Sequence, residues 1–141
     1  MKIVVIGASS LGTMISEFLS NEGYDVVVVD SDESRLESLR HELDVLTITA
    51  DGTSPSFMRS QEITTSDLVV AVTAMDEVNI IASILAKKNG VPHTIARIRD
   101  AKFLSEPVDY IKENFDIDLV LSPELIAARE ISHLVMMPAA I

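Results

Sequence analysis

The sequence contains no cysteine among its 141 residues. A disulfide framework, a thiolate metal site and a cysteine nucleophile are therefore excluded, and a reducing, cytoplasmic setting is the simplest interpretation. The three histidines show neither the paired spacing of a zinc site nor the nearby serine and aspartate of a catalytic triad. We predict no metal ligand and no catalytic residue in this chain.

Positive charge is also scarce. The chain has 11 lysines and arginines against 22 aspartates and glutamates, a net charge of −11 at pH 7. Such a surface has no basic stripe for nucleic acid and disfavours contact with an anionic membrane. No apolar run approaches the roughly 18 residues of a spanning helix, and the apolar N-terminal stretch stops at Gly7. We predict a soluble domain without nucleic-acid binding or membrane insertion.

The composition indicates one folded domain, because hydrophobic residues make up 48% of the chain. Apolar, β-branched runs alternate with helical patterns. These runs are continuous rather than alternating in apolar character, which is typical of parallel strands covered on both faces. We expect strands at residues 2–6, 25–30, 45–49, 68–72, 94–98 and 118–121.

Helical patterns fill the segments between these strands. Residues 11–19 carry one apolar stripe at helical spacing, and Ser54-Pro55 and Ser122-Pro123 each suggest a capped helix start. Further helices are expected at 33–43, at 76–89 before Gly90, and within 101–114, where Pro107 must break or begin a helix. Aspartate at position 76 is expected to cap the helix that it begins. Right-handed crossovers then predict an α/β fold, a doubly wound, six-stranded, Rossmann-like parallel sheet of order 3-2-1-4-5-6.

A glycine-containing turn follows the first strand. Gly7 permits a tight strand-to-helix turn, and Gly12 permits close helix packing, but Ser9 replaces the middle glycine of G-x-G-x-x-G. Backbone N–H groups at such a helix start face a phosphate, and the Ser9 hydroxyl could donate to it. The alternative is a structural turn that binds nothing. The predicted phosphate-binding residues are Gly7, Ala8, Ser9, Ser10, Leu11 and Gly12.

Asp30 ends the second apolar run, eighteen residues after Gly12. A carboxylate at this position accepts hydrogen bonds from ribose hydroxyls and repels a 2′-phosphate, which favours NAD or an adenine nucleotide over NADP. The alternative is a helix N-cap, since any residue of Asp30-Ser31-Asp32 could serve as one. We favour the ribose role for Asp30, with Ser31 beside it.

Three further segments lie at the carboxyl ends of expected strands, where open α/β sheets bind ligands. Asp51-Gly52-Thr53 is predicted either to reach the adenosine or to form only a turn. Thr73 and Ala74 follow the fourth strand at the reversal of strand order, and Thr73 is placed to hydrogen-bond the ligand. Arg97 and Arg99 share one face of the fifth strand, which suits phosphate or carboxylate binding, with surface salt bridges as the alternative.

The last helical segment is apolar over more than one stripe, from Leu125 to Met137. Such a helix needs cover on several sides, so we expect a second subunit or a downstream domain to pack on it. The ending Pro138-Ala-Ala-Ile141 looks like a truncation. We therefore expect residues 1–136 to form the nucleotide-binding domain, and 137–141 to begin a linker to a missing C-terminal domain.

These blocks, taken together, resemble the N-terminal domain of the regulatory subunits of Trk potassium uptake (TrkA), the RCK or KTN family. The resemblance covers essentially the whole chain and departs from the family at Ser9, where glycine is usual. Its blocks are Met-Lys-Ile-Val-Val-Ile-Gly7, Asp30, Asp51-Gly52-Thr53-Ser54-Pro55, Val72-Thr73 with Asp76-Glu77-Val78-Asn79, Ala96-Arg97-Ile98-Arg99, and Ser122-Pro123-Glu124 with Ala128-Arg129-Glu130-Ile131.

The resemblance implies a cytoplasmic regulatory subunit, peripheral to the inner face of the membrane. It implies binding of NAD or NADH, or alternatively ATP, ADP or AMP, and assembly as a homodimer or higher ring on a potassium-translocating membrane subunit. By position, the glycine turn would line the phosphates, Asp30 the ribose, Asp51 and Thr53 the adenosine, and Thr73 the ribose-phosphate. Arg97 and Arg99 would lie near terminal phosphates or a neighbouring subunit, and Glu124 near a cation or a neighbouring chain.

Two other functions are compatible with the sequence. The first is the cofactor domain of an NAD-dependent oxidoreductase, but hydride transfer needs a substrate site and usually an acid or base that these residues do not supply. The second is a domain that assembles without a ligand, because Ser9 departs from the glycine pattern. We rank the non-enzymatic regulator first, since it needs only differential binding to two states.

Overall fold

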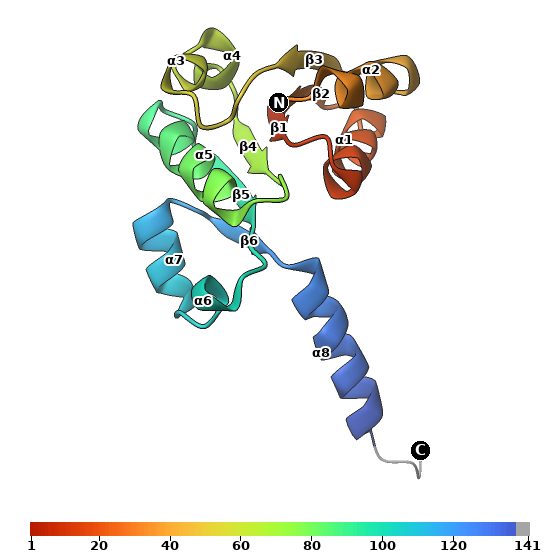
Figure 1. The fold of residues 1–141 in the computed structure, drawn as a ribbon, viewed down its shortest axis with the longest axis vertical. Coiled ribbons are helices and arrows are strands. Elements are labelled where there is room, and N and C mark those ends of the chain that lie inside the picture. Colours follow the sequence, from red (N-terminus) through yellow and green to blue (C-terminus); the bar gives the residue numbers. More distant parts are fainter. Residues whose placement is uncertain (138–141) are drawn as a thin grey trace.

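A computed structural model describes residues 1–137, and its six strands form one parallel sheet (Figure 1). The strand order is β3-β2-β1-β4-β5-β6, so the predicted fold class and order are confirmed. Each expected strand is present within one residue at either end. The strands are β1 (Lys2–Ile6), β2 (Asp25–Asp30), β3 (Leu46–Thr49), β4 (Leu68–Ala71), β5 (His93–Arg97) and β6 (Leu119–Leu121).

Helices cover both faces of the sheet, and one apolar cluster of the core lies on each face, between the sheet and its helices. α1 and α2 pack on one face through residues such as Leu36, which is fully buried. α3, α4, α5 and α7 pack on the other face through residues such as Met58 and Ile63. The helices are α1 (Ser10–Asn21), α2 (Glu33–Glu42), α3 (Pro55–Met58), α4 (Gln61–Thr64), α5 (Asp76–Lys88), α6 (Ala101–Leu104), α7 (Val108–Phe115) and α8 (Pro123–Met136).

Successive side chains of the central strands enter opposite clusters. Val4 and Ile6 belong to the α5 side, whereas Ile3 and Val5 belong to the α1 side. Both sets are at most 2% exposed, which explains why the strands read as continuous apolar runs rather than alternating ones. The sheet therefore gives a rigid base to the loops at its carboxyl edge.

Two of the expected helical segments are each divided into two helices, one of them at a proline as the sequence predicts. Pro107 lies immediately before α7 and separates it from α6. The segment after Ser54 contains two short helices, α3 and α4, instead of the one helix that we expected. The break lies at Ser60, whose N–H donates to the carbonyl of Phe57 and so ends the first helix early.

Two of the expected helix caps are wrong. Asp76 is the first residue of α5, after an N-cap at Met75, and its carboxylate accepts from the N–H groups of Arg99 and Asp100 instead. Ser122 precedes α8 without a capping hydrogen bond, and its buried hydroxyl has no partner among the described residues. For Asp76, a tertiary contact rather than the local sequence determines where the side chain lies.

α8 projects away from the rest of the domain, as Figure 1 shows. None of its residues is buried, although much of its sequence is apolar. Met137 is the first residue of the expected linker at 137–141 and also ends the described part of the chain, so the rest of that linker lies outside it. Within residues 1–137, no helix combines the length and the apolar character needed to cross a bilayer.

Candidate functional site

A cavity of about 340 Å³ lies at the carboxyl edge of the sheet, around the ends of β1, β2 and β3 and the loop after β4. This edge includes the point where strand order reverses, between β1 and β4, which is where open α/β sheets bind their ligands. The volume is near the lower end of the range for small-molecule sites. The lining residues are Ile6, Gly7, Ser9, Val29, Asp30, Ser31, Arg35, Ala50, Asp51, Gly52, Thr73, Ala74, Met75 and Val78.

The turn after β1 admits no side chain at two of its positions. Gly7 has φ +115°, and a Cβ there would lie 2.9 Å from the main-chain nitrogen of Thr73. A Cβ on Gly12 would lie 1.8 Å from the Gly7 carbonyl oxygen, so α1 contacts the turn backbone directly. Ala8, Ser10 and Leu11 complete this turn and the start of α1, although none of them lines the cavity. The N-terminus of α1 thus lies beside the cavity wall that Gly7 and Ser9 form.

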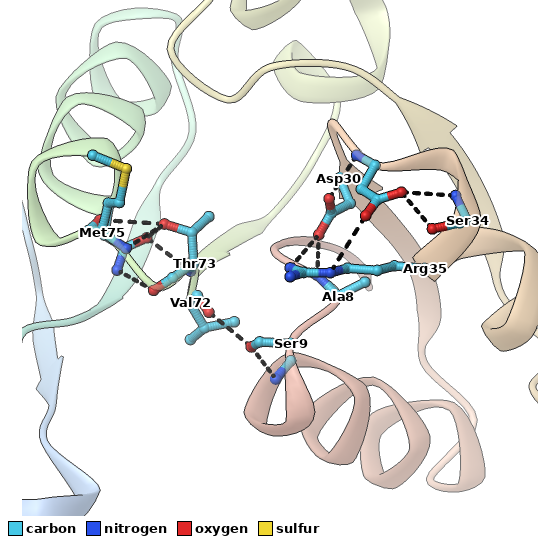
Figure 2. A network of polar contacts seen from close by, with 11 residues as sticks. Ala8, Ser9, Asp30, Ser34, Arg35, Val72, Thr73 and Met75 are labelled. Atoms are coloured by element: carbon cyan, nitrogen blue, oxygen red, sulfur yellow. Dashed lines mark hydrogen bonds and ion pairs between the residues drawn. The ribbon is translucent and has the colours of Figure 1, made fainter.

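Ser9 is the N-cap of α1. Its hydroxyl accepts from the N–H of Gly12 at 3.2 Å and donates to the carbonyl of Val72 at 3.0 Å (Figure 2). The backbone of Ser9 is extended, with φ −69° and ψ 176°, which any residue adopts. The serine is therefore unstrained at the position where the sequence motif expects glycine.

Asp30 lies at the end of β2, faces the cavity and is 8% exposed. Its two carboxylate oxygens accept from the N–H groups of Ala8 and Asp32, each at 2.8 Å (Figure 2). The helix cap that follows is Asp32, which accepts from the N–H of Ser34, so Asp30 is not the cap of α2. Each oxygen keeps a second lone pair, which can accept from a hydroxyl group of a ligand.

Arg35 is a lining residue that the sequence did not indicate. Its guanidinium lies 3.9 Å from Asp30 and 3.7 Å from Asp32, and its side chain is 57% exposed. Two carboxylates thus share this one cation at the outer rim of the cavity. The sequence gives no signal for Arg35, because its spacing of five residues from Asp30 does not distinguish it from any other arginine in the first turn of a surface helix.

The segment after β3 forms the opposite wall. Asp51 Oδ1 accepts from both the N–H and the hydroxyl of Thr53, each at 2.8 Å, and these bonds hold the pKa of the carboxyl below its ordinary value. A Cβ on Gly52 would lie 2.7 Å from the Ile6 side chain, so the backbone itself forms the wall here. Asp51 and Gly52 line the cavity, whereas Thr53 contributes by holding the turn.

The loop after β4 is held by Asn79, which is fully buried on α5. Its side-chain oxygen accepts from the N–H and the hydroxyl of Thr73, at 2.9 and 2.7 Å. Its side-chain nitrogen donates to the carbonyls of Thr73 and Arg97, at 3.1 and 2.9 Å. Thr73 and Ala74 reach the cavity as expected, while Asn79 is a support that the sequence analysis did not single out. An asparagine one turn into an apolar helix face is the signal that could have found it.

Arg97 and Arg99 lie elsewhere. Both guanidinium groups approach the carboxylate of Glu124 at the start of α8, Arg97 through a hydrogen-bonded ion pair and Arg99 at 3.6 Å. The main-chain N–H at the helix start, and then Arg97, hold the pKa of Glu124 below its ordinary value. Neither arginine lines the cavity, although they share one side of the strand end as the sequence predicts. Within residues 1–137, no cluster of three or more metal-ligating side chains is present.

Comparison with known proteins gives the same assignment along the whole chain. The family model of the TrkA-N domain matches residues 3–123. The Trk system potassium uptake protein TrkA of Haemophilus influenzae is 35% identical over 143 residues, which cover 100% of this chain and 31% of that protein. A TrkA homolog of Pyrococcus abyssi is 36% identical over 141 residues, with 98% of this chain and 61% of the relative covered. The chain therefore spans less than two thirds of either relative, and the resemblance inferred from the sequence is confirmed.

Solved structures share the fold at low identity. The TrkA-N domain of the inner membrane protein ybaL from Escherichia coli superimposes with a TM-score of 0.79 at 18% identity, covering 94% of this chain and 95% of that one. A Kef C-terminal domain from Shewanella denitrificans in its AMP-bound form gives 0.74 at 14% identity, with 99% and 84% covered. The GsuK channel bound to NAD gives 0.70 at 12% identity, with 86% and 21% covered.

Proposed function

The chain belongs to the TrkA-N domain family, and on that premise we propose that it is a cytoplasmic regulatory module that binds an adenine nucleotide or NAD(H) and gates a membrane potassium-uptake system. The observation that carries the proposal is the buried Asp30 carboxylate, which faces a cavity at the reversal of strand order. Relatives named for potassium uptake, and fold neighbours with bound NAD and AMP, support it.

The residues present suit a nucleotide. Gly7, Gly12 and Gly52 have no room for a Cβ against neighbouring protein atoms, so the backbone packs tightly where the turn after β1, the start of α1 and the loop after β3 meet. In the proposal, the ribose hydroxyls bind Asp30, and the phosphates bind the N–H groups at the start of α1, where the helix dipole favours negative charge. Ser31, Asp51 and Thr73 would hold the adenosine and ribose, with Ala8, Ser10, Leu11, Thr53 and Ala74 shaping these walls.

Regulation by this module needs binding rather than catalysis. The cavity wall, within the described residues, contains carboxylates, hydroxyls and one guanidinium, and no histidine. An anion that reached Arg97 and Arg99 would compete with Glu124 for them, and Glu124 lies in the first turn of α8. Because α8 leads away from the domain, a ligand that favours one arrangement of this ion pair could bias the segments that follow.

We further propose that the module acts as a homodimer or a higher ring, with α8 packing on a second copy of the chain. Apolar residues of α8 from Ile131 to Met136 are 63–80% exposed. Met14 and Phe18 on α1 are also 60% and 63% exposed. The two connections that follow β4 pack their helices on the α5 side of the sheet, so they do not cover α1. Exposed apolar surfaces of this kind typically mark protein interfaces.

Calorimetric titration of the purified chain tests the nucleotide proposal directly. AMP, ADP, ATP, NAD and NADH are the probes, with NADP as the matched control for the 2′-phosphate. We expect adenine nucleotides or NAD(H) to bind at least tenfold more tightly than NADP, because Asp30 would repel the extra phosphate. Absence of binding by every probe would contradict the proposal. NADH oxidation coupled to a small carbonyl substrate would instead support the oxidoreductase alternative.

A further inference from the structure

We infer that Ser9 selects an adenine mononucleotide over a dinucleotide in this pocket, an inference that rests on the proposed function. Ser9 is the one place where the turn departs from the glycine pattern. Its hydroxyl does not project freely into the cavity; it is bonded on both sides, to Gly12 and to Val72. The bond to Gly12 uses one of the N–H donors at the start of α1. The bond to Val72 joins the ends of β1 and β4, over which a dinucleotide would pass.

The first consequence concerns the donors at the start of α1. The first N–H groups of a helix have no partner within the helix, and they are the donors that hold a phosphate. The Ser9 hydroxyl takes one of them, the N–H of Gly12, at 3.2 Å. The N–H groups of Ser10 and Leu11 remain at the helix end. The turn therefore keeps fewer donors for a pyrophosphate than the same turn with glycine at position 9.

The second consequence concerns the path across the sheet edge. A dinucleotide crosses the reversal point, so that its two halves lie on either side of it. Ser9 follows β1 and Val72 follows β4, and the 3.0 Å bond between them connects these two strand ends (Figure 2). Ser9 lines the cavity whereas Val72 does not, so this bond lies at the cavity wall.

The surroundings of β5 agree with a ligand that does not extend to the end of this strand. Beyond β4, the strand end carries Arg97, which is paired with Glu124 and lies outside the cavity. The cavity itself combines the carboxylate of Asp30 and the wall at Asp51 and Gly52 with the loop at Thr73 and Ala74, and it does not include the end of β5. Its volume of about 340 Å³ suits a single nucleoside with its phosphates at α1 better than two nucleosides.

The test compares AMP and ADP with NAD and NADH by calorimetry, on the unmodified chain, S9G and S9A. We expect the unmodified chain to bind AMP or ADP at least tenfold more tightly than NAD or NADH. In both variants this ratio should fall below about threefold, mainly through tighter dinucleotide binding, because the bond to Val72 is gone and the Gly12 N–H is free. Glycine is accepted at a helix N-cap, so S9G should keep the fold.

S16A is the matched control, since Ser16 is a buried serine of the same helix whose hydroxyl donates to the Gly12 carbonyl. It should leave the ratio unchanged. NAD or NADH binding as tight as AMP in the unmodified chain would overturn the role of Ser9 while leaving the proposed function in place. A ratio that changes in S9G but not in S9A would assign the effect to the Cβ and overturn the hydroxyl bridge. Absence of binding by these four nucleotides and by ATP would overturn the proposed function itself.

Discussion

The carboxylate of Asp30 accepts a hydrogen bond of 2.8 Å from the N–H of Ala8. This bond joins the end of β2 to the turn after β1, so one buried group supports the turn and faces the cavity at the same time. A carboxylate is suited to both tasks because it offers about four acceptor positions. Loss of this side chain should therefore affect both the stability of the domain and its affinity for a nucleotide.

The variant Asp30→Ala should bind adenine nucleotides more weakly by about 1–3 kcal/mol, the cost of losing hydrogen bonds to a charged acceptor. It should also unfold at a lower urea concentration, because the N–H groups of Ala8 and Asp32 lose their acceptor. Titration calorimetry and urea unfolding measure the two effects separately.

Asp32→Ala is the control for this experiment. Asp32 caps α2 and is 50% exposed, and it does not line the cavity. Its removal should cost about 1 kcal/mol of stability through the lost cap, with nucleotide affinity unchanged. An Asp30→Ala protein that binds as tightly as the unmodified chain would refute the ribose assignment.

Asn79→Ala should destabilise the domain by about 2–4 kcal/mol, because it removes a fully buried side chain with four hydrogen bonds to Thr73 and Arg97. Urea unfolding at neutral pH measures this loss. Ser83→Ala is the control, since Ser83 is equally buried on α5 but donates only one hydrogen bond, to the carbonyl of Asn79. It should cost about 1 kcal/mol or less. Equal losses in the two variants would show that Asn79 does not hold the loop.

The acid stability of the domain should follow its carboxylates, several of which have pKa values below the ordinary 4.5 of glutamate or 3.8 of aspartate. A lowered pKa in the folded state stabilises the protein above the ordinary value, and that stabilisation is lost as the pH falls through the lowered one. The urea midpoint should therefore stay level above about pH 5 and decrease below it. Glu124→Gln should decrease less steeply there, and an unchanged slope would argue against the ion pair with Arg97.

The sequence predicts the sheet because each strand and its crossover are local patterns. Four buried valines before Asp30, or Pro107 before α7, indicate an element regardless of what surrounds it. Sheet order then follows from the handedness of the crossovers. Asp30, Asp51 and Thr73 line one cavity for the same reason, since the carboxyl ends of parallel strands meet at one edge.

The roles that the sequence could not predict depend on partners far along the chain. Asp76 contacts the backbone of Arg99 and Asp100, more than twenty residues away, so its position at a helix start suggested a cap that does not form. Arg97 lies at the ligand edge, but its partner Glu124 follows 27 residues later. Helix-capping rules and strand periodicity describe only neighbours, and these side chains have stronger distant partners.

The exposed face of α8 gives the last prediction, which concerns assembly. Light scattering at micromolar concentration should show a dimer or a larger species, because the described domain alone leaves the α8 apolar surface uncovered. The double variant Leu134→Glu and Val135→Glu should give a monomer, since these side chains are 70% and 76% exposed and a buried unpaired carboxylate is costly.

His133→Glu is the control, because it adds a negative charge to the same turn of α8 without removing an apolar side chain. The control should keep the assembly of the unmodified chain, so that a monomer in the double variant reflects the apolar face rather than added charge. A monomeric unmodified chain would remove the second copy as the partner of α8. The remaining explanation for its apolar surface would then be a different chain segment or protein that packs on it.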